Sequence, residues 1–198
     1  MKRIMISGAG LMLTASLSFG DLITNSGFET GDLTGWSTFG PGWRVGSGGD
    51  ANSGTFGAVN DVETVHVDEW RGIFQNVAVT AGETYTAGVF IRTVNLESSR
   101  SWFELQWLDS DGGVISQLQS PFVTSDQSFT FMSVNDAIAP AGAVTASLRG
   151  IVQMLSSPTG NDDFHIFDDF TIVPEPGTAA LLVAGFTALL AARRRRAG

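Results

Sequence analysis

The chain has 198 residues, with 11 lysines and arginines, 20 aspartates and glutamates, and no cysteine. The lack of cysteine excludes disulfides, thiol chemistry and zinc–thiolate sites. Between Asp21 and Glu175, five arginines stand against all 20 acidic residues, and this net charge of −15 repels nucleic acids and anionic lipid headgroups while it attracts divalent cations.

The first 20 residues have the three parts of a secretory signal peptide. Lys2 and Arg3 precede an apolar stretch, residues 4–17, and Ser18-Phe19-Gly20 supplies the small residues of a cleavage site. A first transmembrane helix or a buried core helix is the alternative, but the apolar stretch is short for a membrane span. We therefore expect signal peptidase to remove residues 1–20, so that the mature chain begins at Asp21.

Residues 21–173 are expected to form one all-β domain, because short apolar stretches recur between turn signals and no helical periodicity persists. Turns are expected at residues 81–83 and 109–113. A series of strands without intervening helices predicts a β-sandwich or jelly roll. The expected strands, each rich in β-branched or aromatic residues, are 71–79, 85–93, 102–108, 129–134, 145–154 and 165–173.

Alternation within two of these strands predicts which side chains form the core. In residues 102–108, Phe103 and its alternate neighbours lie on one side, and Glu104 and Gln106 lie on the other. In residues 85–92, the face opposite the core set includes Phe90 and Arg92 and need not be buried. The expected core set is Trp36, Tyr85, Ala87, Val89, Ile91, Phe103, Leu105 and Trp107.

Short motifs along this domain resemble those of carbohydrate-binding modules with a galactose-binding-like jelly roll. The resemblance spans nearly the whole domain and implies the same fold. The motifs are an opening Asn25-Ser26-Gly27-Phe28-Glu29 with Gly35-Trp36, a hairpin-like Gln75-Asn76-Val77 with Ala81-Gly82-Glu83-Thr84-Tyr85, a turn at Trp107-Leu108-Asp109-Ser110-Asp111-Gly112, and a closing strand with Phe167-Asp168-Asp169-Phe170.

The same resemblance implies a structural calcium ion where the first and last strands meet. Glu29 and Asp168 match the family's carboxylate ligands, and Gly27 would supply a backbone carbonyl; Asp50 or Asn52 would be the loop ligand. Oxygen-only ligands suit calcium, and a cation would offset part of the acidic charge. The alternative is that both carboxylates are solvated at strand ends.

Two other acidic segments are expected to be ordinary turns. Asp109-Ser110-Asp111-Gly112 is similar to the start of an EF-hand loop, but it lacks the closing glutamate and is flanked by strands, so we expect a hairpin. Asn161-Asp162-Asp163 is expected to be a solvated turn rather than a metal loop.

A sugar site needs an aromatic platform and a few polar groups for the hydroxyls. The aromatic residues least explained by core patterning are Trp43, Trp70, Phe90 and Trp102, although each could instead be a packing residue. The expected ligand-binding set combines three of them with polar residues on outward faces: Trp70, Phe90, Arg92, Trp102, Glu104, Gln106 and Arg149.

No catalytic residue is expected. His66 and His165 are the two histidines, and neither lies in a nucleophile motif such as Gly-x-Ser-x-Gly; His165 is expected to be a strand histidine. Paired carboxylates perform glycoside hydrolysis, but among 20 acidic residues some pair is inevitable, so proximity in sequence carries little weight.

Residues 174–198 resemble the PEP-CTERM sorting signal. Pro174-Glu175-Pro176 precedes an apolar segment, residues 178–192, which is expected to be a transmembrane helix. That helix is a little shorter than a bilayer core of about 30 Å, and basic side chains can snorkel to make up the difference. The basic cluster should stay on the cytoplasmic side, and it consists of Arg193, Arg194, Arg195 and Arg196.

The resemblance of this tail implies that an exosortase reads and cleaves it. The two ends together predict an exported protein that is held for a time in the inner membrane and then lies at the cell surface or in an exopolysaccharide matrix. Non-catalytic binding of a polysaccharide, neutral or weakly charged, is the leading expected role of the domain. The alternatives are a structural or adhesive matrix protein without a sugar site and a small glycan-active enzyme. Nucleic acid is not an expected partner.

Overall fold

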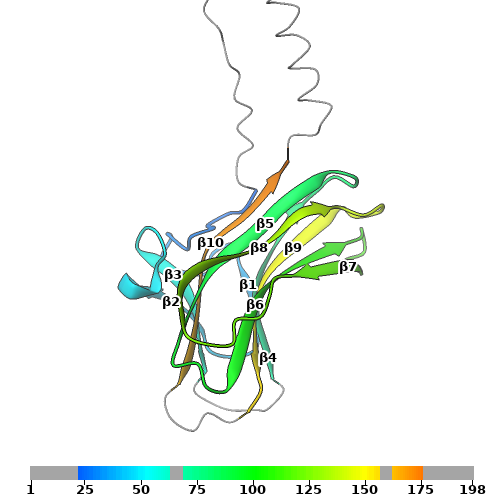
Figure 1. Ribbon diagram of the computed structural model, residues 1–198. Coiled ribbons are helices and arrows are strands. Elements are labelled where there is room, and N and C mark those ends of the chain that lie inside the picture. Colours follow the sequence, from blue (N-terminus) through cyan, green and yellow to red (C-terminus); the bar gives the residue numbers. More distant parts are fainter. Residues whose placement is uncertain (1–21, 63–68, 157–161, 176–198) are drawn as a thin grey trace, which may run out of the picture.

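The structure is a computed structural model that describes residues 22–62, 69–156 and 162–175. These residues form two antiparallel five-stranded sheets, ordered β1-β4-β9-β6-β7 (the first sheet) and β2-β3-β10-β5-β8 (the second sheet), with the hydrophobic core between them (Figure 1). The predicted all-β jelly-roll sandwich is therefore confirmed. The elements are β1 Ser37–Phe39, β2 Trp43–Ser47, the 3-10 turn η1 Gly48–Asp50, β3 Phe56–Val62, β4 Trp70–Ala78, β5 Thr84–Val94, β6 Ser99–Leu108, β7 Val114–Gln119, β8 Gln127–Ile138, β9 Thr145–Met154 and β10 Asp163–Pro174.

All six predicted strands are confirmed as β4, β5, β6, β8, β9 and β10. The connection at residues 81–83 is a turn as predicted, but it does not close a hairpin, because β4 lies in the first sheet and β5 in the second. The turn at residues 109–113 does close the β6–β7 hairpin. There the Asp109 carboxylate accepts the backbone N–H groups of Asp111 and Gly113 at 2.9 and 2.8 Å.

Four strands were not predicted, and each lacks the usual signal. β1 and β2 are only three and five residues long and are separated by Gly40-Pro41-Gly42, which reads as a loop. β3 contains Gly57 and Asn60, which are uncommon in strands. β7 is exposed along its whole length, so it shows no alternation of buried and exposed side chains.

The predicted core is confirmed at every residue of the expected set, which is buried between the sheets. Trp36 packs at one end of this core, with ring centroids 5.2 Å from Phe28 and 4.4 Å from Phe170. Phe28 and Trp36, the aromatic residues of the opening motif, thereby pack against Phe170 of the last strand, β10.

The prediction that residues 161–163 form a solvated turn is wrong for Asp163. This residue begins β10 and is fully buried. Its carboxylate can be buried because hydrogen bonds from the backbone that precedes β6 take the place of those from water. Its side chain therefore belongs to the interior of the sandwich and not to the acidic surface.

The described residues include no helix long and apolar enough to cross a membrane. The predicted signal peptide, the predicted tail helix 178–192 with its arginines, and His66 lie outside the described residues.

Candidate functional site

The residues predicted to bind a ligand are divided between the two sheets. Trp102, Glu104 and Gln106 alternate with the core residues of β6, so they lie on the outer face of the first sheet. The register places Arg149 of β9 directly beside Glu104. Trp70 begins β4 and contacts Trp102 on the same face. Five of the seven predicted residues are thus brought together, and Phe90 and Arg92 of β5 are in the second sheet.

Three aromatic rings form a cluster at one end of this outer face, which we call the aromatic platform: Trp70, Trp102 and Phe122. Trp102 is central, with centroids 5.5 Å from Trp70 and 5.0 Å from Phe122, both nearly edge-on. Trp70 is 50% exposed and Phe122 is 40% exposed, whereas Trp102 is only 2% exposed. Trp102 therefore supports the platform, and the prediction that it offers its own ring to a ligand is wrong, because its two neighbours cover it.

Phe122 was not predicted, since it follows Pro121 in the connection between β7 and β8, where no strand periodicity marks it. The Arg100 guanidinium carbon lies 3.9 Å from the centroid of Phe122, and its Nε donates to Gln153 Oε1 at 2.9 Å. A guanidinium over an aromatic face holds the ring in place. The sequence thus indicated only the two tryptophans of the platform, and the structure adds Phe122 with Arg100 stacked on its ring.

A row of polar side chains continues from the platform across β6 and β9. Glu104 Oε1 accepts a hydrogen bond from Gln106 Nε2 at 2.8 Å and lies 3.4 Å from Arg149 Nη1. The Arg149 guanidinium carbon also lies 5.3 Å from the Phe39 ring centroid and 5.4 Å from that of Phe74. These contacts fix the planes of the polar groups. They suit the few oriented donors and acceptors that a sugar site places beside an aromatic surface.

Phe90 and Arg92 do not join this surface. Phe90 packs on Phe131 of β8, with centroids 5.1 Å apart. Arg92 donates from Nη1 to the backbone carbonyl of Gly49 in η1 and so ties the β2–β3 connection to β5.

The residues predicted to bind calcium meet where the N-terminal segment contacts β10. A Cβ atom added to Gly27 would lie 3.4 Å from Asp168 Oδ1, 3.1 Å from Asp169 Oδ1 and 3.9 Å from the Glu29 side chain. Asp168 Oδ2 accepts the backbone N–H groups of Asn52 and Ser53, at 2.7 and 3.2 Å. Gly27 therefore lies close to Asp168 and to the aliphatic part of Glu29, while the Glu29 carboxylate accepts hydrogen bonds from Thr55 and Phe56.

The Glu29 carboxylate is held by Thr55 and Phe56, which follow Asn52 and Ser53 in the chain. Its Oε1 accepts the N–H groups of Thr55 and Phe56 at 2.9 and 3.0 Å, and these bonds lower the pKa of the exposed carboxyl. Burial raises the pKa of Asp168 to about 6, against the opposing hydrogen bonds from Ser53 and Asn52. One carboxylate is thus stabilised in its charged form and the other is destabilised.

The donor set at this junction fits a calcium ion only in part. Carboxylate and carbonyl oxygens are the right chemistry, and a cation would offset the cost of burying Asp168. However, no group of three or more His, Cys, Asp or Glu side chains suited to a metal occurs within the described ranges. Backbone carbonyls and water would have to complete the coordination.

A buried polar cluster of Ser99, Asp163 and His165 resembles a catalytic triad in composition but not in geometry. Ser99 Oγ donates to Asp163 Oδ2 at 2.5 Å and lies 2.7 Å from His165 Nε2. Because the hydroxyl has one proton and gives it to the carboxylate, His165 must donate from Nε2. A triad histidine would instead accept the serine proton, and its Nδ1 would face the carboxylate.

The cluster is also closed to a substrate. Ser99, Asp163 and His165 are all buried, and His165 Nδ1 has no hydrogen-bond partner. Burial lowers the pKa of His165 to about 4, an effect that Asp163 opposes and Arg71 reinforces. His165 is therefore the strand histidine that the sequence predicted, and it holds the interior together as a neutral hydrogen-bond donor.

The profile of the family described as "Carbohydrate binding domain" matches residues 20–132. Many solved structures share the fold, among them the following three. TmCBM61 in complex with β-1,4-galactotriose is 19% identical, with a TM-score of 0.56 over 79% of this chain and 99% of that one. The CBM22-1 xylan-binding domain of Paenibacillus barcinonensis Xyn10C is 20% identical, with a TM-score of 0.51 over 75% and 91%.

The third is the Stig cyclase Fisc of Fischerella sp. TAU, which is 19% identical with a TM-score of 0.57 over 79% of this chain and 97% of that one. The same sandwich fold therefore occurs in proteins that bind sugars and in an enzyme. At these sequence identities, the similarity shows the fold alone. No curated protein sequence matches the chain significantly.

Proposed function

The chain belongs to the carbohydrate-binding domain family, and on that basis we propose that it is a non-catalytic module that binds a neutral or weakly charged polysaccharide on the outer face of its first sheet. The observation that carries this proposal is the aromatic platform. Trp70 and Phe122 expose large rings beside the hydrogen-bonded row of Glu104, Gln106 and Arg149. Exposed aromatic residues beside oriented polar groups match the apolar face and the hydroxyls of a pyranose.

A neutral ligand is favoured by charge. The net charge of −15 between Asp21 and Glu175 gives an anionic chain a long-range repulsion to overcome, whereas stacking and hydrogen bonding to a neutral chain carry no such penalty. Galactotriose and xylan, named with two of the structural neighbours, make a β-1,4-galactan and a xylan reasonable first probes.

Replacing Trp70 by alanine is expected to weaken binding to such a polysaccharide by at least about 10-fold, because an exposed aromatic anchor typically dominates a small interface. Affinity electrophoresis of the full chain measures this, with galactan, xylan and two uronic-acid polymers at low and high salt. Ile138→Ala is the matched control, since it removes an exposed apolar side chain from the second sheet. Retardation only by the acidic polymers and only at low salt would contradict the charge argument.

The structural-matrix alternative shares the fold and differs in having no sugar site, so absence of retardation by every polymer would favour it. The enzyme alternative has little support among the described residues. In the cluster of Ser99, Asp163 and His165, the serine hydroxyl donates to the carboxylate and not to the histidine, and all three side chains are buried away from any substrate.

Calcium at the junction of Gly27, Glu29 and Asp168 is part of the same proposal. Its ligands come from opposite ends of the domain, so binding would add to folding stability, by about 2.7 kcal/mol when free calcium is 100 times its dissociation constant. Thermal melts with calcium and with chelator are expected to differ for the wild type and for Asp111→Asn, and to coincide for Glu29→Gln. An equal calcium response in Glu29→Gln would place the ion elsewhere, and no response in the wild type would remove it.

We also propose the export route that the two ends predict: removal of residues 1–20, temporary anchoring by residues 178–192, and cleavage near Pro174-Glu175-Pro176 by an exosortase, leaving the domain at the cell surface or in the matrix. Intact-mass analysis of protein from the envelope tests it, since recovery of the full-length chain in the cytosol would contradict it.

A further inference from the structure

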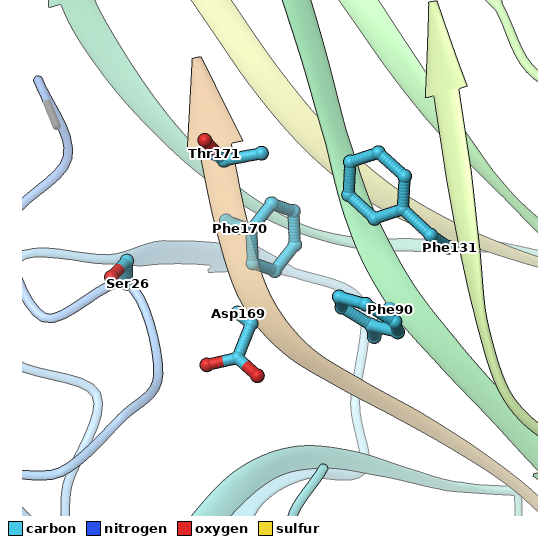
Figure 2. Close-up of a pocket in the computed structure, with 6 residues that line it drawn as sticks. All are labelled: Ser26, Phe90, Phe131, Asp169, Phe170 and Thr171. Carbon is cyan, nitrogen blue, oxygen red and sulfur yellow. The ribbon is translucent and has the colours of Figure 1, made fainter. Parts of the chain in front are cut away.

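The outer face of the second sheet carries a hollow of about 570 Å³, on the side of the sandwich opposite the aromatic platform. We call it the second-sheet hollow. Its volume lies within the range of small-ligand sites, about 300–1,000 Å³, but the hollow is shallow and mostly open to solvent. It is lined by Ser26, Phe90, Phe131, Asp169, Phe170 and Thr171 (Figure 2).

One wall of the hollow is aromatic. Phe90 of β5 and Phe131 of β8 are direct cross-strand neighbours, with ring centroids 5.1 Å apart and planes inclined by 47°. Phe131 is 39% exposed, and neither ring belongs to the core cluster. Gly88 makes this position possible, because a Cβ atom there would lie 2.7 Å from the Phe131 ring. The ring thus rests against the β5 backbone and presents its other face to solvent.

The opposite wall is polar and is held in place. The β10 ladder shifts register between Asp168 and Thr171, and Asp169 has a positive φ of 51° within this bulge. Asp169 Oδ2 accepts Asn52 Nδ2–H at 2.8 Å, and its Oδ1 accepts the Ser53 hydroxyl at 2.9 Å. Figure 2 shows the carboxylate and the side chains of Ser26 and Thr171 on the side away from the rings of Phe90 and Phe131.

These two walls select a ligand that is apolar on one face and rich in hydroxyls on its edge. The Asp169 oxygens keep lone pairs for further donors, and the Ser26 and Thr171 hydroxyls can donate or accept. The carboxylate and the net charge of the region disfavour an anion. A purely apolar ligand would leave the polar wall unpaired. A neutral sugar ring satisfies both walls.

We propose that the second-sheet hollow is a second glycan-binding site, so that one chain binds two polysaccharide segments on opposite faces and cross-links them. This inference rests on the proposed function, because it assigns the same class of ligand. A module with two sites on opposite sheets cannot place both on one straight polymer strand. Such a module therefore favours bridging between two polymers. Two sites on the same face would instead raise the affinity for a single polymer.

The test uses the full chain with two forms of one probe, a β-1,4-galactan or a xylan. Calorimetry with short oligosaccharides is expected to give two sugars per wild-type chain and one for either Trp70→Ala or Phe131→Ala. Loss of the aromatic wall should weaken the second site by at least about 10-fold. Light scattering with the long polymer should show bridging for the wild type and for the control Ile138→Ala, and none for either single variant.

Thr171→Arg gives a second variant, because its long side chain would fill the hollow without removing a ring. It should lose the second site and the bridging while it keeps retardation through the platform. One sugar per wild-type chain that is kept in Phe131→Ala and lost in Trp70→Ala, or bridging that persists in Phe131→Ala, overturns the second site and leaves the platform standing. No sugar bound by the wild type overturns both. A drop in oligomeric mass of Phe131→Ala in the absence of glycan would show that the hollow docks a second copy of the chain, which also overturns it.

Discussion

Replacing Asp163 by alanine is expected to destabilise the protein by about 3–5 kcal/mol, since several donors in the interior would lose this acceptor. Asp163 Oδ1 accepts the Glu97 N–H at 3.0 Å, and its Oδ2 accepts the Ser98 N–H at 3.0 Å and the Ser98 hydroxyl at 2.9 Å. The Ser99 hydroxyl is a further donor to the same oxygen. One carboxylate thereby joins the start of β10 to the start of β6, across the two sheets.

Urea unfolding of Asp163→Ala, with Asp162→Ala as the matched control, measures this effect. Asp162 is the neighbouring carboxylate and lies outside β10, so its removal should change the free energy of unfolding by less than about 0.5 kcal/mol. Asp163→Asn should be intermediate, because the amide oxygen can still accept while its N–H₂ group meets other donors. Equal stability of the two alanine variants would mean that water replaces the carboxylate.

Much of the fold could be predicted from the sequence because core-facing and outward-facing side chains alternate cleanly in β5 and β6. Phe103, Leu105 and Trp107 in β6 and the matching residues of β5 are buried as expected, since each sheet has one face on the core. β3 could not be predicted in the same way. Its Gly57 is required because a Cβ atom would lie 2.0 Å from the backbone oxygen of Asp50, a contact that only the folded chain creates.

The candidate site was predicted less completely, because exposure depends on neighbours from distant strands. Alternation placed Trp102 on the outer face, but Trp70 and Phe122 cover it, and nothing local to β6 indicates this. The same limit applies to Phe90: alternation placed it on a face that need not be buried, but the sequence did not indicate which sheet that face belongs to. Asp163 is the opposite case, a residue predicted to be exposed that is buried. An acidic residue after Asn161-Asp162 indicates a surface turn, and only its hydrogen bonds to residues 97–99 show that it is interior.

The stability of the protein is expected to respond to acid through two groups that act in opposite directions. The pKa of His165 is lowered from 6.5 to about 4 in the folded protein. As the pH falls from about 6.5 to 4, the unfolded chain takes up a proton that the folded protein refuses, so stability is lost, by about 3 kcal/mol below pH 4. The pKa of Asp168 is raised from 3.8 to about 6, so the folded protein takes up this proton first and gains stability over nearly the same interval.

Substituting each group separates the two contributions. His165→Gln keeps a donor for Ser99 and removes the titration, so with chelator present its free energy of unfolding, relative to wild type, should increase as the pH falls from about 6.5 to 4. Asp168→Asn should show the reverse trend relative to wild type, and a somewhat smaller one, because the pKa of Asp168 is shifted less than that of His165. The measurement is urea unfolding at a series of pH values, and only the slope against pH is compared, since either substitution can shift stability at neutral pH. Parallel curves for His165→Gln and wild type would mean that His165 takes up its proton in the folded protein, and hence that water or a rearranged side chain reaches its unpartnered Nδ1.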